Sequence, residues 1–362
     1  MQPKLLHILI SPLDWGLGHT TRCIPLISQL IEAGHKVTLA GYGRSLILLK
    51  KEFPLLESIE LQGFSPSYSR SGSMALHLLL LLPQFILSIY KEHFKLKQLI
   101  AKYHFDIIIS DNRYGLWNRN VRSILITHQV MIKTPGWLKF AEYPIYLVSC
   151  LLINRFDSCW IPDYKKTPGL SGDLSHKYPL PQNAEFIGPL SRFKTGKPAQ
   201  QISENGKIVA IISGPEPQRS IFEDLVTRQL IEINQPAILL SGKPESEKKE
   251  VSIGNLTILP HLATHELRSF ISASRLVICR SGYSSIMDIE SLGAKALFVP
   301  TPGQTEQLYL ASHHQQTGTA LWRTQEKLNL KEDIPEALKH IGFKKNSHST
   351  SLKEVIEGLK KK

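Results

Sequence analysis

The sequence predicts an α/β protein built from two Rossmann-like domains in tandem, each with a parallel sheet. Its 362 residues suit two domains, at about 100–200 residues each. Short apolar runs of strand length alternate with longer helical segments over 1–188, and the alternation restarts over 208–345. Between them, 189–207 combines glycine and proline with a polar run and is predicted to be a linker. The end, 346–362, is predicted to be a basic tail.

The N-terminal domain begins with a β-α-β pattern. Leu5–Ile10 is a short apolar run, typical of a strand covered on both faces. Apolar residues then recur at helical spacing before the next strand, Lys36–Ala40. Such a unit requires a right-handed crossover and a parallel sheet. Further strands are expected at Asp106–Ser110, Ser123–Thr127, Cys159–Ile161 and Glu185–Ile187, and long helices at Met74–Tyr103 and Trp137–Phe156.

The C-terminal domain repeats the pattern, and the ends of its strands predict where ligands bind. Open α/β sheets bind ligands at the carboxyl ends of their strands. If the two domains face each other, both sets of strand ends open onto an interdomain cleft, so the loops after the strands are the places to look for chemistry. The expected strands are Ile208–Ile212, Ala237–Leu240, Leu256–Ile258, Leu276–Cys279 and Ala296–Val299.

Composition narrows the class of protein. The formal net charge of +12 favours partners such as phosphorylated small molecules or anionic lipid. Nucleic acid is not an expected partner, because the chain lacks zinc-ligand spacing, an RNA-recognition signature and a base-reading basic helix. The four cysteines form no CxxC pair, which fits a reducing cytoplasm. The N-terminus carries no signal peptide pattern.

The most apolar stretch, Met74–Tyr90, has two interpretations. It is short for a bilayer span, which needs about 20 apolar residues. With the basic residues Lys91, Lys95 and Lys97 beyond it, the stretch could rest on an anionic membrane surface. It could equally be a core helix of the first domain. The predicted location is cytoplasmic, and in the first case peripheral on the inner face of the cytoplasmic membrane.

The loop after the first strand is the first candidate site. Gly16 and Gly18 let backbone N–H groups approach an anion where the next helix begins. A dinucleotide site would need a third glycine, where Thr21 stands, and an acidic residue after the second strand, which ends at Gly41. NAD is therefore not an expected cofactor.

His19 opens the helix after this loop, where the positive end of the helix dipole favours a neutral imidazole. Such an imidazole can take a proton from an attacking hydroxyl, although capping of the helix is an alternative role. Polar residues also follow two other strands, and they are either site residues or turn formers. These residues are Asp111, Asn112, Arg113 and His128.

Three loops of the C-terminal domain carry polar residues at the start of a helix. Arg280, Ser281 and Gly282 precede a helix whose free N–H groups suit a diphosphate, and Asp288 could accept from ribose hydroxyls or be a solvated helix residue. The second loop offers donors and acceptors for sugar hydroxyls, or caps its helix. In the third loop, an arginine could neutralise a phosphate. The residues are Gln304, Glu306 and Gln307 in the second loop, and Ser213, Gly214 and Arg219 in the third.

At these residues the sequence resembles glycosyltransferases of the GT-B fold, and most closely family 28, which includes the N-acetylglucosaminyltransferase that makes lipid II. The similarity is clearest over Leu276–Tyr309 and is specific only in the C-terminal half. Gly16–His19 is similar to the glycine-rich N-terminal loop of the family. The residue sequence of Pro12–His19 also resembles that of a group of uncharacterised bacterial proteins with a family 28 C-terminal domain.

The resemblance implies an inverting, metal-independent hexosyltransferase with no cofactor. It would move a hexose or N-acetylhexosamine from a nucleotide diphosphate sugar, with a UDP-sugar the expected donor, to a lipid-linked or envelope glycan acceptor. By the same resemblance Asp288 binds the ribose, Glu306 and Gln307 bind the donor sugar, and His19 is a base oriented by Asp111. Arg280–Gly282 and Ser213-Gly214 would hold the phosphates. The sequence contains no DxD metal signature.

Two departures from the family pattern leave room for other functions. Asp288 stands where the family usually has glutamate, and Gly214 is followed by Pro215 and Pro217, which offers fewer N–H groups. Arg219 would then have to compensate for the missing phosphate contacts. A nucleotide-sugar hydrolase or epimerase on the same fold is the alternative, and a non-catalytic nucleotide-sugar or lipid-binding protein is a third.

Overall fold

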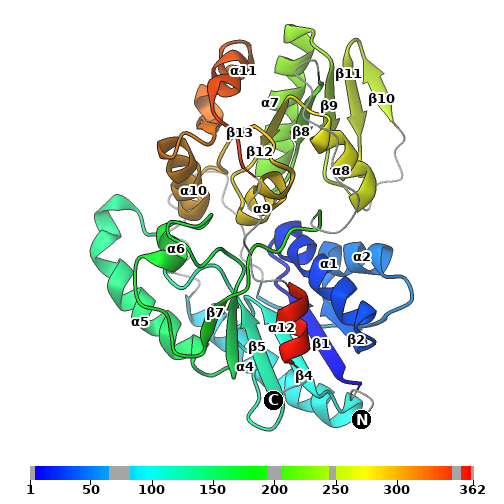
Figure 1. Cartoon of the computed structure of the whole chain (residues 1–362), viewed down its shortest axis with the longest axis vertical. Helices are drawn as coiled ribbons and strands as arrows, with labels where there is room; N and C mark the ends of the chain where they lie inside the picture. Colours follow the sequence, from blue (N-terminus) through cyan, green and yellow to red (C-terminus); the bar gives the residue numbers. More distant parts are fainter. Residues whose placement is uncertain (1–4, 65–81, 194–205, 244–249, 345–351, 360–362) are drawn as a thin grey trace. The chain divides into compact units, whose positions relative to one another are not determined.

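A computed structural model describes residues 5–64, 82–193, 206–243, 250–344 and 352–359. These residues form two compact α/β units (Figure 1). The first unit contains the described residues up to Leu190 together with 352–359, and the second contains those from Ser191 to 344. Met74–Leu81 of the apolar stretch singled out above lie outside the described residues.

The described part of the N-terminal unit is built on a seven-stranded sheet in the order β3-β2-β1-β4-β5-β6-β7, with every neighbouring pair parallel. Chain order runs outward from β1 to β3 and then resumes at β4 on the other side of β1. The order therefore reverses between β1 and β4, which is where open α/β sheets bind ligands. The strands are β1 (His7–Pro12), β2 (Lys36–Gly41), β3 (Glu57–Glu60), β4 (Ile107–Asp111), β5 (Arg122–Ile126), β6 (Ser158–Ile161) and β7 (Ala184–Phe186).

Helices cover both faces of this sheet, because right-handed crossovers in opposite directions put their helices on opposite faces. On one face, Leu96 and Leu99 of α4 pack on Leu9 and Ile108. One predicted helix, Trp137–Phe156, is instead a 3-10 helix followed by an α-helix, with non-helical dihedral angles at Leu138. The helices are α1 (Leu17–Glu32), α2 (Gly43–Glu52), α4 (Leu82–Tyr103), η1 (Gly136–Ala141), α5 (Glu142–Ile153) and α6 (Asp173–His176).

The C-terminal unit has a second seven-stranded sheet among its described residues, in the order β10-β11-β9-β8-β12-β13-β14, and its order reverses between β8 and β12. All its pairs are parallel except β10 with β11. The strands are β8 (Ile208–Ile211), β9 (Ala237–Leu240), β10 (Val251–Ile253), β11 (Leu256–Leu259), β12 (Leu276–Cys279), β13 (Ala296–Phe298) and β14 (Leu321–Trp322). Its helices are α7 (Gln218–Ile233), α8 (Thr264–Ser272), α9 (Tyr283–Leu292), α10 (Thr305–Gln316), η2 (Gln325–Lys327) and α11 (Leu330–Lys339).

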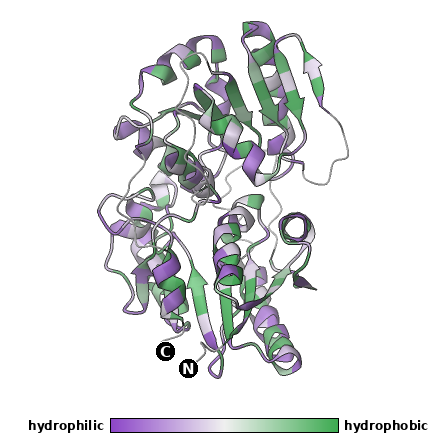
Figure 2. Cartoon of the chain, turned by 45° about the vertical axis from the view of Figure 1, so that its right-hand side comes forward, coloured by the Kyte–Doolittle hydropathy of each residue, from purple (hydrophilic) through white to green (hydrophobic). Residues whose placement is uncertain are grey.

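Burial explains why these segments form strands. The central strands are mostly hydrophobic (Figure 2), and Ile208, Leu276, Ile278 and Leu297 are almost completely buried between helices on the two faces. Strands covered on both faces read as continuous apolar runs, which is how they were predicted. The predicted pair of parallel α/β sheets is therefore confirmed.

The C-terminal segment returns to the first unit. Helix α12 (Leu352–Gly358) packs on α1, with Ile356 and Leu359 buried. The carbonyl oxygen of Leu359 accepts a hydrogen bond of 3.3 Å from Nη1 of Arg122, the first residue of β5. The described part of the predicted basic tail is thus a helix of the N-terminal unit (Figure 1).

Candidate active site

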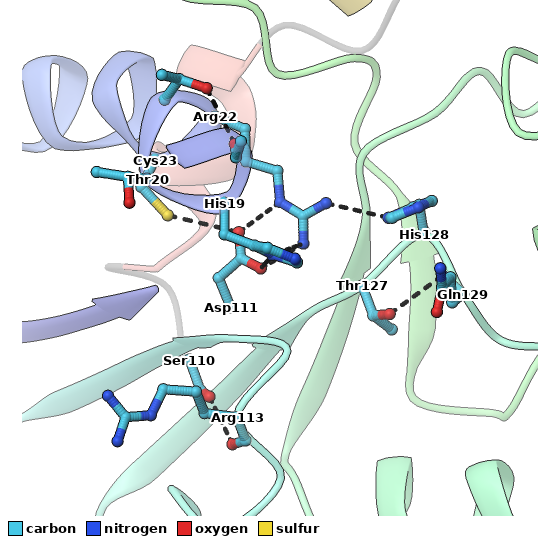
Figure 3. Close-up of polar contacts among 12 residues, drawn as sticks. His19, Thr20, Arg22, Cys23, Ser110, Asp111, Arg113, Thr127, His128 and Gln129 are labelled. Carbon is cyan, nitrogen blue, oxygen red and sulfur yellow. Dashed lines mark hydrogen bonds and ion pairs between the residues drawn. The ribbon is translucent and has the colours of Figure 1, made fainter. Parts of the chain in front are cut away.

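The N-terminal site lies where the strand order reverses, between β1 and β4. Pro12 of β1 stands opposite Asp111 of β4, and the backbone N–H of Leu13 donates to the Asp111 carbonyl oxygen at 3.0 Å. This register carries the glycine loop past the end of β4 and brings the first turn of α1 to Asp111. Nδ1 of His19 lies 2.7 Å from Oδ1 of Asp111 (Figure 3). The structure therefore brings together the two residues predicted as base and orienting carboxylate.

Arg22, which was not singled out in the sequence, joins this pair. Its Nε donates to Oδ2 of Asp111 at 2.5 Å, and its Nη2 donates to Oδ1, so the guanidinium grips both carboxylate oxygens. Its Nη1 lies 3.0 Å from Nδ1 of His128 (Figure 3). The sequence offered one signal for Arg22: it lies three residues after His19, and residues three apart on a helix share a face.

Asp111 is a fixed negative charge. It is completely buried. Burial alone would raise the pKa of Asp111, but Arg22 and His19 together hold that pKa well below its usual range. A carboxylate that stays ionised can keep the adjacent imidazole nitrogen protonated. The His19 side chain is 20% exposed, so the other ring nitrogen can meet a substrate.

Two other residues predicted near this site behave differently from His128. The Arg113 guanidinium points away from His19 (Figure 3) and is held by Glu92 at 2.9 Å, by Ser11 and by the Leu61 carbonyl oxygen. Asn112 has a left-handed backbone, with φ of 56°, which is turn chemistry. These bonds give Arg113 a structural role, and its predicted place on the acceptor side of the site stays a prediction.

In the C-terminal unit, Arg280 is turned inward. Its guanidinium carbon lies 4.0 Å from the centre of the Phe222 ring. Nη1 donates to the Val299 and Pro300 carbonyl oxygens, and Nη2 to the Gln218 carbonyl oxygen and to Gln325. Burial lowers the pKa of Arg280 to about 9, so it still carries its charge at neutral pH. These contacts tie together the loops after β12 and β13 and the start of α7, and they leave the expected phosphate contact unsupported.

Arg219 is also engaged inside its own unit. It is buried, with Nε donating to Glu216 at 2.6 Å and Nη1 donating to Glu223 at 2.7 Å. Two carboxylates thus face one guanidinium, so Arg219 is not presented as the compensating phosphate ligand that the sequence predicted.

Asp288 anchors a backbone segment of its own unit. Oδ1 accepts from the Ser191 hydroxyl at 2.8 Å, and Oδ2 accepts from Nε of Arg192 at 3.1 Å. Burial raises the pKa of Asp288, against the opposing effect of Arg192 and Ser191. Both oxygens already have partners, so the expected ribose contact would require Asp288 to exchange them.

Other predicted donor residues do come together at the ends of β12 and β13. The Ser281 hydroxyl donates to the Gln307 carbonyl oxygen at 2.8 Å, and Oε1 of Gln307 accepts from the Thr301 N–H at 2.8 Å. Nε2 of Gln307 donates to Oε1 of Gln304 at 2.5 Å. Glu306 follows in the first turn of α10. Thr301 also faces Gly214, because a Cβ added at Gly214 would lie 3.7 Å from Oγ1 of Thr301, and Ser213 precedes that glycine.

The start of α9 is open. Gly282 is its N-cap residue, without a side-chain capping bond, and a Cβ added at Gly282 would meet nothing within 4 Å. Uncapped N–H groups at a helix start suit an anion. Within the described part of the chain, no group of three or more His, Cys, Asp or Glu residues is placed to hold a metal ion.

Comparison with known proteins agrees with this layout. Residues 220–361 match the glycosyltransferase family 28 C-terminal domain. The chain is 27% identical over 325 residues to a protein of Methanosarcina mazei described as an uncharacterized glycosyltransferase, covering 83% of this chain and 81% of that protein. The expected bacterial grouping is not confirmed, because such homologues are archaeal.

A second relative carries a more specific description. It is the UDP-N-acetylglucosamine--N-acetylmuramyl-(pentapeptide) pyrophosphoryl-undecaprenol N-acetylglucosamine transferase of a Sulfurihydrogenibium species, 24% identical over 82% of this chain and 77% of that protein. Among solved structures, the spinosyn forosaminyltransferase SpnP superposes with a TM-score of 0.62 at 14% identity, covering 99% of both chains. The chain is therefore a glycosyltransferase of the GT-B fold whose residues 220–361 match the family 28 C-terminal domain.

Proposed function

We propose that the chain transfers a hexose or N-acetylhexosamine from a UDP-sugar to an acceptor hydroxyl, with inversion and with His19 as the general base. The observation that carries this proposal is the 2.7 Å contact between Nδ1 of His19 and buried, ionised Asp111. A proton held on Nδ1 leaves the lone pair on Nε2, where a hydroxyl can deliver its proton. The printed name of the Sulfurihydrogenibium relative supports a UDP-sugar as donor.

The reaction is a single displacement. The acceptor oxygen attacks the anomeric carbon as His19 takes the hydroxyl proton, and the bond from that carbon to the diphosphate oxygen breaks. The electron pair of that bond leaves with the nucleoside diphosphate, and the new glycosidic bond has the opposite configuration. Asp111 stabilises the imidazolium that forms.

Donor binding is assigned to the loops that follow β8, β12 and β13. We assign the diphosphate to the start of α9, beside Ser281 and Gly282, since oriented N–H groups at a helix start stabilise charge that grows as the donor bond breaks. The sugar hydroxyls are assigned to Gln304, Glu306 and Gln307. Ser213 and Gly214 would border the phosphates, with Arg280 holding the loops in place rather than touching the donor.

Nucleotide screening tests this proposal directly. UDP and UDP-sugars should raise the melting temperature of the full chain, and the shift should grow with the logarithm of their concentration above the dissociation constant, because a ligand that binds only the native state stabilises it. The double variant Ser281→Ala/Gln307→Ala should lose most of that shift. No shift with any nucleotide sugar would count against a donor site. EDTA should leave turnover unchanged if the transfer is metal-independent, and donor breakdown without an acceptor would indicate a hydrolase instead.

An acceptor at a membrane surface is supported by exposed apolar side chains on the N-terminal unit. Ile86, Leu87, Tyr90 and Phe94 of α4 are each 45% exposed or more, beside exposed lysines at 91 and 95. By length and composition alone, Gly136–Ile153 is long and apolar enough to cross a membrane, and 22% of it is buried. Apolar residues bordered by lysine suit an anionic bilayer surface, so we propose a peripheral location on the inner face of the membrane. Absence of binding to anionic vesicles at low salt would argue for a soluble acceptor.

A further inference from the structure

Arg22 lies at the centre of the His19 site, yet the transfer proposed above does not use it. Its side chain is buried, with 1% exposed. The guanidinium reaches three titratable side chains that come from three elements (Figure 3). They are His19, one turn earlier on α1, Asp111 at the end of β4, and His128 just after β5. A buried arginine in this position must affect where the protons of the site reside.

His19 has two neighbours competing for one ring nitrogen. Nδ1 lies 2.7 Å from Oδ1 of Asp111 and 2.9 Å from Nη2 of Arg22. A proton on Nδ1 would donate to the carboxylate, whereas a lone pair there would accept from the guanidinium. The carboxylate contact is the shorter one and is assisted by charge, which makes it the stronger bond. Nη2 carries two hydrogens and also donates to Oδ1 of Asp111, so it has a partner without His19. The proton therefore resides on Nδ1 of His19.

Arg22 also cancels the charge that would otherwise hold a second proton on His19. An ionised carboxylate beside an imidazole favours the imidazolium. Here the same carboxylate is gripped at both oxygens by a guanidinium, which leaves the surroundings of His19 close to neutral. Three further groups face the cluster. Cys23 and Tyr114 are buried thiol and phenol groups whose pKa values burial raises, so both are uncharged, and Asp14 of the glycine loop interacts electrostatically with His19.

His128 receives the opposite assignment. Its Nδ1 lies 3.0 Å from Nη1 of Arg22. A guanidinium can only donate, so Nδ1 of His128 must accept and its proton must lie on Nε2. One guanidinium thus fixes two imidazoles in opposite tautomers.

We propose that Arg22 is a positioning residue for the transfer: acting through Asp111, it holds His19 in the Nδ1–H form and keeps the imidazole unprotonated until the acceptor hydroxyl gives up its proton. This inference rests on the proposed role of His19 as base.

The experiment is ¹⁵N NMR of the full chain labelled at histidine, with His19 and His128 assigned from His19→Gln and His128→Gln. The wild type should show the proton on Nδ1 of His19 and on Nε2 of His128. In Arg22→Gln, the ratio of imidazolium to imidazole at His19 should rise about tenfold at a fixed pH near neutrality, since the carboxylate loses its counter-charge. Arg22→Lys keeps the positive charge but loses the planar guanidinium that donates to two partners at once. It should leave this ratio near the wild-type value while His128 loses its fixed tautomer.

Arg113→Gln is the matched control. It removes another buried arginine of the same unit whose guanidinium bonds go to Glu92, Ser11 and Leu61, and it should leave both histidine signatures unchanged. A wild-type His19 carrying its proton on Nε2 would overturn the proposal, as would an unchanged ratio in folded Arg22→Gln. If Arg22→Gln does not fold, the wild-type tautomers and Arg22→Lys still decide. The NMR measurement does not depend on turnover. A fully active His19→Ala would contradict the proposed role of His19 as base, and it would do so independently of the tautomers that the spectra report.

Discussion

Phe222 and Arg280 stack with 4.0 Å between the ring centre and the guanidinium carbon, which places a charged side chain inside the C-terminal core. The ring supplies cation–π attraction, and three backbone carbonyls with one side-chain amide accept the guanidinium hydrogens. Arg280 therefore connects the loops that we assign to donor binding. Its removal should mainly lower the free energy of unfolding.

Arg280→Met tests whether this arginine is structural. The variant keeps an unbranched chain against Phe222 but leaves the carbonyl oxygens of Val299, Pro300 and Gln218 without their donor. At about 1–3 kcal/mol for each buried group left unpaired, we expect the free energy of unfolding of the C-terminal unit to fall by at least about 3 kcal/mol. Urea denaturation measures this. Full stability combined with lost UDP binding would instead restore the direct phosphate contact predicted from the sequence.

His19→Ala separates chemistry from donor binding. We expect kcat to fall by about 10²–10⁴, the usual effect of losing a general base, while the melting-temperature shift with UDP stays near the wild-type value. Asp111→Asn should also lose activity, because its neutral amide can no longer stabilise the imidazolium. Turnover within a few-fold of wild type in His19→Ala would remove this residue from the mechanism.

The sequence predicted the elements with strong local signals and missed the roles that depend on distant partners. The apolar runs of β1, β4, β8 and β12 are visible in the sequence because both faces of each strand are covered. The exposed strand β10 (Val251–Ile253) has no such pattern, and it was missed.

The site residues show the same difference between local sequence signals and roles that depend on distant partners. The pairing of His19 with Asp111 was expected from the family resemblance, and the strand ends that meet at one edge of the sheet bring the two residues together. The inward course of Arg280 could not, because it depends on Phe222 and on carbonyl oxygens from residues 62 and about 20 positions away in the chain. A basic residue in a phosphate-loop position gives the same sequence signal whether it faces a ligand or the core.

Asp288→Asn distinguishes an anchor from a ribose ligand. The amide should weaken the contacts with Ser191 and Arg192 and lower the free energy of unfolding by about 1–3 kcal/mol. Arg192→Gln should act in the same direction. We expect the dissociation constant for UDP, measured by calorimetry, to change less than threefold in both variants. A tenfold weaker affinity in Asp288→Asn alone would show that the carboxylate turns to the ribose when the nucleotide binds.

Asp163 should make the N-terminal unit sensitive to acid. Burial would raise its pKa, but bonds from His176, the N–H groups of Leu170 and Ser171 and the Ser171 hydroxyl lower it below the usual value. A carboxylate with a depressed pKa stabilises the fold above its unfolded pKa of about 3.9, and this contribution is lost as the pH falls through the folded value. Unfolding free energies measured between pH 2 and pH 7 should fall less steeply below about pH 4 in Asp163→Asn than in the wild type. Equal slopes in the two proteins would contradict the depressed pKa.

The outward face of η1 and α5 should contribute to vesicle binding. Trp137, Phe140 and Leu151 are 66%, 78% and 68% exposed, while Tyr146 and Ile153 pack inward on the sheet. Replacing the three exposed residues with serine removes apolar area worth up to about 1.5–3 kcal/mol for each fully buried side chain, so we expect binding to anionic vesicles to weaken tenfold or more. Leu55→Ser is the matched control, because Leu55 is 96% exposed and lies outside this surface. Sedimentation at low salt measures binding, and an equal loss in the control and the triple variant would show that general surface hydrophobicity, and not this face, contacts the bilayer.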